Sequence, residues 1–98
     1  MVLKWFDAGE AKDFGKRLGQ FLIEKMPPES AGKKEKSPAR KKEVLNQMIG
    51  QIAKFKQEHK LNIYKKAQLG NTFKWTLNDA GYDQEFVDEL TKTLMTFL

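Results

Sequence analysis

The sequence predicts an all-α domain, a small four-helix bundle-like fold with a mobile basic linker between the first and second helices. Three observations support this prediction. Apolar residues recur at spacings of three and four in four separate segments, as in amphipathic helices. Capping residues or prolines mark the ends of these segments. The length of 98 residues and the eleven aromatic side chains suit a single core, so residues 1–98 are treated as one domain.

The first helix is predicted over residues 7–26. Asp7 is its expected N-cap, and Glu10 can reach back to the Asp7 amide as in a capping box. The apolar stripe of this helix consists of Phe14, Leu18, Phe21, Leu22 and Met26. Gly15 and Gly19 lie one turn apart inside it, where each glycine costs about 1 kcal/mol relative to alanine. Either these glycines are tolerated at the surface, or another element packs closely against them.

Two consecutive prolines at positions 27 and 28 end this helix, because neither can donate to the helical hydrogen-bond ladder. Residues 27–37 contain no periodic apolar side chain, so we expect a mobile linker there. Ser37 and Pro38 then mark the next start, as N-cap and first helical residue. The second helix is predicted over residues 38–59. Its stripe is Leu45, Met48, Ile49, Ile52, Phe55 and His59, flanked by Val44 and Ala53.

The third helix is predicted over residues 62–80, with Asn62 as its N-cap. One side presents Leu69, Phe73, Leu77 and Ala80, while the nearly opposite side presents Tyr64, Ala67 and Trp75. A helix with two apolar sides is either central in a bundle or offers one side to a partner. The alternative to one continuous helix is a break at Gly70, with Asn71 as the next N-cap. We favour the continuous helix.

A specified corner precedes the last helix, which is predicted over residues 83–98. Gly81 has the signature of the left-handed residue that ends a helix, and Leu77 and Tyr82 are the pair that meets in a Schellman ending. Asp83 is the expected N-cap of the following helix. The apolar stripe of that helix consists of Phe86, Val87, Leu90, Leu94, Phe97 and Leu98.

Two functional motifs that resemble this corner are excluded by their residues. A calcium loop with Gly81 at its sixth position would place Thr76, Ala80 and Val87 where oxygen ligands are needed, and none is a carboxylate. A DNA-reading helix-turn-helix would insert the last helix into the major groove. Phosphate repulsion opposes this, because the helix begins with Asp83, Glu85, Asp88 and Glu89.

The residues needed for catalysis are also missing. The chain has no cysteine, its two serines, Ser30 and Ser37, lie in or beside the linker, and His59 is its single histidine. His59 sits at a helix end, where a capping or half-buried role is the expected one. We therefore predict a protein that is not an enzyme and that has no cofactor and no metal site.

The net charge of +5 is concentrated in one segment. Residues 33–42 alone carry +5, residues 1–32 are balanced, and residues 81–98 carry −3. The basic side chains of the segment are Lys33, Lys34, Lys36, Arg40, Lys41 and Lys42. They are candidates for an electrostatic contact with nucleic acid or an acidic protein, or they keep the linker solvated.

Two functions remain as alternatives. The first is a non-enzymatic helical protein-interaction module that binds a protein partner or a second copy of itself. Its candidate apolar anchors are Tyr64 and Trp75, and Phe97 and Leu98 add apolar surface. The second is a nucleic-acid-binding accessory protein that uses residues 33–42 and lysines of the second and third helices. No apolar run approaches the roughly 20 residues that span a bilayer, so we expect no membrane contact and a cytoplasmic location.

Overall fold

A computed structural model describes residues 8–28 and 38–98, without the side chains of Pro38 and Arg40. These residues form four α-helices and no strand: α2 (Gly9–Lys25), α4 (Pro38–Glu58), α5 (Ile63–Ala80) and α6 (Gln84–Phe97). The predicted all-α, four-helix fold is confirmed, and the predicted helix ends lie within two residues of the observed ones. Three predictions fall wholly or mostly outside the described residues: the Asp7 cap, the Ser37 cap, and the mobility of the linker over residues 27–37, of which only 27 and 28 are described.

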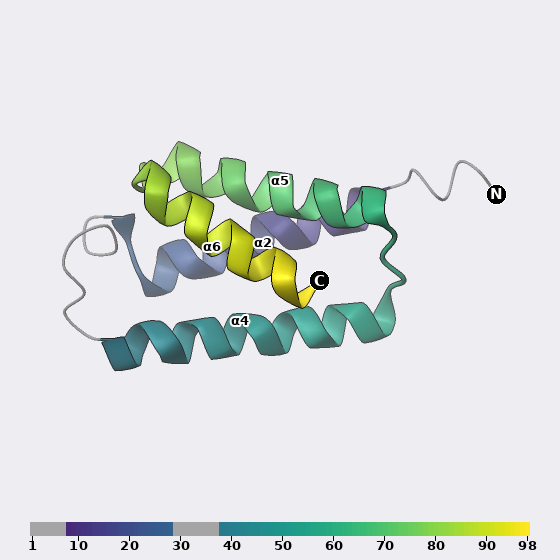
Figure 1. Cartoon of the computed structure of the whole chain (residues 1–98), viewed down its shortest axis with the longest axis horizontal. Helices are drawn as coiled ribbons and strands as arrows, with labels where there is room; N and C mark the ends of the chain where they lie inside the picture. The colour runs from purple at the N-terminus through teal and green to yellow at the C-terminus, as the bar shows by residue number, and fades with distance from the viewer. Residues whose placement is uncertain (1–7, 29–37) are drawn as a thin grey trace.

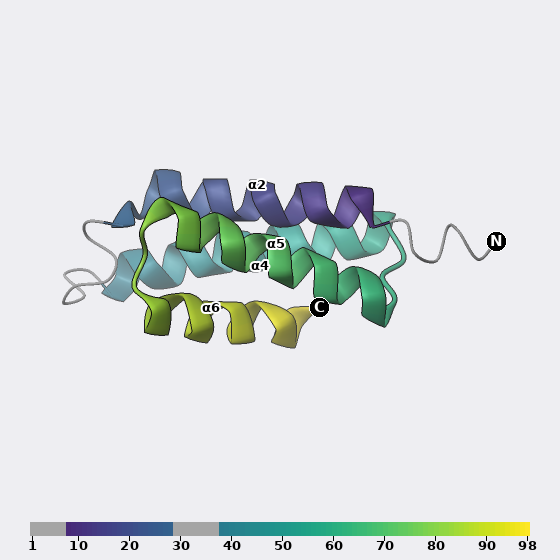
Figure 2. The same cartoon turned by 90° about the horizontal axis from the view of Figure 1, so that it is seen from above.

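The four helices run along one long axis. α5 lies above α4 in Figure 1, and α2 lies above α6 in Figure 2. α2 lies beside α5, α5 beside α6, and α6 beside α4. α4 in turn contacts α2. The pair α4 and α5 is consecutive in sequence, yet it occupies a diagonal. α2 and α5 run in one direction along the axis, while α4 and α6 run in the other (Figure 1). α4 and α6 are therefore parallel neighbours.

α2 and α5 form the closest helix pair, and two glycines explain why. A Cβ built on Gly15 would collide with the backbone carbonyl oxygen of Leu69. A Cβ on Gly19 would come within 2.7 Å of Cγ2 of Thr76. Of the two alternatives for these glycines, close packing against another element is the correct one.

α5 is continuous through Gly70, as favoured from the sequence. Gly70 is buried, and a Cβ there would lie 2.6 Å from Sδ of Met95 on α6. The glycine therefore provides room for a neighbouring side chain and does not break the helix. Asn62 caps the start of α5 by accepting from the Lys65 amide at 2.8 Å.

The face that α4 buries differs slightly from the predicted stripe. Val44, placed at the edge of that stripe, is 3% exposed, whereas the predicted stripe members Leu45 and Ile49 are only half-buried. The buried side chains of α4 are Val44, Met48, Ile52 and Phe55. The helix is thus rotated toward α2, because Phe55 stacks on Phe14 with ring centroids 4.2 Å apart. This rotation leaves Leu45 and Ile49 at the flank that faces α6.

The corner between α5 and α6 has the predicted chemistry. Gly81 is left-handed at φ 98°, and the Tyr82 amide donates to the Leu77 carbonyl at 3.3 Å, as in a Schellman ending. The Asp83 carboxylate accepts from the amides of Glu85 and Phe86 at 3.1 and 3.3 Å. Both capping predictions are confirmed.

Tyr82 has a second role that local pattern did not predict. Its buried hydroxyl lies within hydrogen-bond reach of the carbonyl oxygens of Leu22 and Met26, in the last turn of α2. The phenol therefore adds a donor at the C-terminal end of α2, where the Leu22 carbonyl also accepts from the Met26 amide at 2.7 Å. Burial raises the pKa of Tyr82 to about 12.

Candidate functional site

The main surface hollow follows the seam between α4 and α6, and we call it the α4–α6 groove. It consists of three adjoining hollows that share Leu45, Ile49, Ile52, Leu90, Thr93 and Phe97 at their boundaries. Its other lining residues are Lys41, Met48, Ala53, Lys56, Gln57, Phe86, Glu89 and Leu94. The largest of the three hollows, near the end of α6, has a volume of about 350 Å³.

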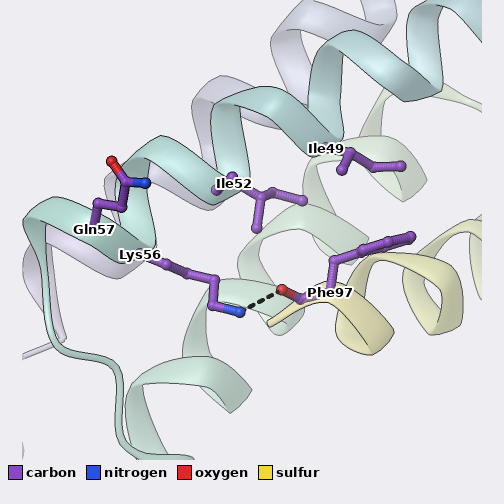
Figure 3. Close-up of a pocket in the computed structure, with 6 residues that line it drawn as sticks. Ile49, Ile52, Lys56, Gln57 and Phe97 are labelled. Atoms are coloured by element: carbon purple, nitrogen blue, oxygen red, sulfur yellow. Dashed lines mark hydrogen bonds between the residues drawn. The ribbon is translucent and has the colours of Figure 1, made fainter.

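The groove exists because the two halves of the bundle pack differently. α2 and α5 approach through glycine, whereas α4 approaches α6 at few points and through long apolar side chains. Phe97 stays 39% exposed at one end of the groove, and Leu45 and Ile49 stay half-buried along its α4 side. Figure 3 shows Ile49, Ile52 and Lys56 reaching from α4 toward Phe97. The floor is therefore apolar and only partly covered by the chain itself.

Charged groups flank this apolar floor with opposite signs on its two sides. On the α4 side, Lys41 holds its ammonium 5.6 Å from the ring centroid of Phe86. Lys56 donates to the Phe97 carbonyl at 3.0 Å, which places a cation against the C-terminal end of α6 (Figure 3). On the α6 side, Glu89 lines the groove and is exposed. Such a site can bind an amphipathic surface.

A second hollow, of about 220 Å³, lies where α2 begins and α4 ends. His59 Nδ1 lies 3.1 Å from Oε1 of Glu10, and the imidazole stacks on Phe55 at 4.4 Å between ring centroids. The half-buried role expected for His59 is confirmed. The remaining charged groups around it are Glu58, Lys60 and Lys65. Because the acids and bases here offset one another, the hollow has no marked preference for an ion of either sign.

No group of three or more His, Cys, Asp or Glu side chains that could hold a metal ion occurs in residues 8–28 and 38–98. Within the same part of the chain, no helix is long and apolar enough to cross a membrane.

The predicted basic site is only partly described. Lys33, Lys34 and Lys36 lie outside the described residues, as does the side chain of Arg40. Lys41 and Lys42 lie in the first turns of α4, where Lys41 lines the groove and Lys42 is exposed beside it. The structure thus joins one end of the predicted basic segment to an apolar surface.

The two predicted apolar anchors, Tyr64 and Trp75, lie away from the groove on α5. Tyr64 is half-buried and packs against the core, while Trp75 is 58% exposed. Eleven residues separate them, or roughly 16 Å along a helix, so they do not form one compact anchor. Of the two residues expected to add apolar surface, Phe97 reaches the groove, whereas Leu98 is buried at 8% exposure.

Sequence reasoning missed the groove itself. The available signal was the breadth of the α4 stripe, which has more apolar side chains than one buried face can hold. The breadth of the stripe does not reveal which neighbouring helix the additional apolar side chains of α4 face. Comparison with protein families, curated proteins and solved structures found no match to this chain.

Proposed function

We propose that this protein is a non-enzymatic helical interaction module and that the α4–α6 groove is its docking surface. The observation behind this proposal is the apolar floor of the groove, which runs from Leu45 to Phe97. Its middle hollow is narrow, at about 10 Å³, and no charged side chain lines it. A partner helix laid along such a floor would bury side chains spaced by three and four residues. Exposed lysines and a glutamate at the edges would set its orientation.

The geometry also supports a non-catalytic role. The groove presents lysine amines, one carboxylate and one threonine hydroxyl, and none of these is paired with a base that would activate it. Aromatic and aliphatic side chains with a polar rim are instead typical of protein interfaces. Phe97 is the strongest candidate anchor, since its ring is large and partly exposed.

Two neighbouring residues of α4 allow a direct test of this surface. Ala53 lines the groove, whereas Lys54 is exposed and lines none of its hollows. A photo-crosslinking amino acid placed at Ala53 should give discrete crosslinked products in the source cell, and the same group at Lys54 should not. Identical product patterns at both positions would contradict the groove as the docking surface.

A substitution pair completes the test. Ile49→Asn puts an amide in the groove, and Trp75→Asn makes the same kind of change on the exposed side of α5. We expect Ile49→Asn to reduce Ala53 crosslinking while Trp75→Asn leaves it unchanged. Circular dichroism melts of both variants check that the fold persists. Loss of crosslinking with Trp75→Asn alone would move the docking surface to α5.

Nucleic-acid binding by the basic segment stays a prediction. Its test is a titration with labelled DNA and RNA at low salt, comparing the wild type with a chain in which the six basic residues of 33–42 are glutamine. Affinity that falls steeply with salt, and falls again in the variant, would support it. Equal affinity of the two proteins would exclude it.

A further inference from the structure

The two lips of the α4–α6 groove have opposite charge at the same end of the bundle. On the α4 lip, Lys41 and Lys42 lie near the helix start, and on the α6 lip the exposed Glu85 and Glu89 lie one turn apart near that helix start. Because α4 and α6 run parallel, these four charges share one end of the groove (Figure 1). The contact between Lys41 and Phe86 confirms this alignment.

This arrangement is complementary to a second copy of itself when the two-fold axis runs parallel to the groove. A two-fold axis parallel to the groove places α4 of one protomer over α6 of its partner at the same height along the bundle. Lysines then face glutamates twice, once on each side of the axis. A two-fold axis across the groove would instead place α4 over α4 with its direction reversed. The charged ends of the two protomers would then lie at opposite ends of the dimer, so the lysines of one protomer would not reach the glutamates of its partner.

We propose that the occupant of the groove is a second copy of this chain, docked with its two-fold axis parallel to α4 and α6. This inference rests on the proposed function, because it uses the same docking surface. The α6 helix of the partner subunit covers the half-buried Leu45 and Ile49, and its α4 helix covers the exposed side of Phe97. The two pairs of parallel helices thereby form a shared apolar layer with ion pairs at one end.

The expected dimer is weak. The groove spans seventeen residues of α4, from Lys41 to Gln57, or roughly 25 Å of helix. Two helices of about 10 Å width each then cover roughly 500 Å² per protomer, near the lower limit for specific interfaces. A concentration-dependent dimer that weakens with added salt follows from this area and from the charged lips.

Charge reversal tests both the dimer and its symmetry. Reversing one lip, by Glu85→Lys with Glu89→Lys or by Lys41→Glu with Lys42→Glu, places like charges opposite each other. We expect the dissociation constant of each to rise by about tenfold or more at low salt. Reversing both lips in one chain restores opposite signs and should return the dissociation constant to within about threefold of the wild type.

Sedimentation equilibrium with the full chain measures these constants, and circular dichroism checks that each variant is folded. A double-reversed chain as weak as the single-lip variants would overturn the proposed symmetry. A wild type that stays monomeric at millimolar concentration would overturn the second copy as occupant. If Ala53 nevertheless crosslinks to another protein, the interaction module stands and only this inference fails. A monomer without Ala53-specific crosslinks would remove both.

Discussion

The contact between α2 and α5 is tested most directly by Gly15→Ala, with Gly50→Ala as its matched control. Both glycines lie inside long helices, and alanine is favoured over glycine there by about 1 kcal/mol. They differ in what the new methyl group meets. At Gly50 nothing lies within 4 Å of the added Cβ, whereas at Gly15 the Cβ collides with the backbone oxygen of Leu69.

The sign of the effect should therefore differ between the two sites. Gly50→Ala adds only helix propensity and should stabilise the fold by about 0.5 to 1 kcal/mol. At Gly15 the added Cβ meets the backbone of Leu69 on α5, and it would also lie 3.3 Å from Cβ of Thr72 on that helix. Relief requires α2 and α5 to separate, and such overpacking costs about 1 to 3 kcal/mol. We expect a net loss of up to about 2 kcal/mol after the gain in propensity.

Thermal denaturation followed by circular dichroism measures both changes. For a domain of this size, 1 kcal/mol shifts the Tm by roughly 4 to 8 °C. Gly15→Ala should lower the Tm by up to roughly 16 °C, while Gly50→Ala should raise it by a few degrees. A rise of similar size for both variants would show that α2 and α5 are not in backbone contact at Gly15.

Three further predictions concern other close contacts. Gly70→Ala should change the stability measured in a thermal melt by less than about 1 kcal/mol, because the added Cβ meets the flexible end of the Met95 side chain. A loss of stability as large as that of Gly15→Ala would contradict this prediction. Gly81→Ala should cost about 1 to 2 kcal/mol because φ is 98°, and an unchanged Tm would mean the corner is wrongly placed. Tyr82→Phe should destabilise the fold at neutral pH by leaving carbonyls of α2 short of a donor. Tyr82 ionises near its ordinary pKa of 10.0 in the unfolded chain and near a pKa of about 12 in the folded chain. The wild type should therefore be more stable than Tyr82→Phe below pH 10, and this difference should shrink as the pH rises toward 12. A difference in Tm between the two proteins that stays constant from pH 10 to 12 would refute the assignment.

The features predicted correctly from sequence are those decided within a few residues. The ending at Gly81 and the cap at Asp83 depend on backbone groups at most five positions away, so local pattern was sufficient. The hydrogen bonding of the Tyr82 hydroxyl to the end of α2 could not be predicted from local pattern. This hydroxyl reaches residues 56 and 60 positions earlier, and only the tertiary fold brings them together.

The candidate site illustrates the same limit. Periodicity showed that α4 is amphipathic, but it did not decide whether Val44 or Leu45 lies in the core, since both border the same stripe. That choice depends on the stacking of Phe14 on Phe55, a contact between two helices. It also decides what lines the groove. The basic residues were visible as a run, whereas their alignment with the acids of α6 depends on the parallel arrangement of the two helices.

The diagonal placement of α4 and α5 has a consequence for the order of folding. Two helices that follow each other in a chain usually form an early hairpin, but here neither can bury its apolar side against the other. α5 must instead find α2 across the intervening chain, so the folding barrier includes closure of a long loop. α4 has the loosest attachment, and its amides should exchange with solvent by local opening before those of α2 and α5. A helix that opens in this way would let the groove widen without unfolding the rest of the molecule.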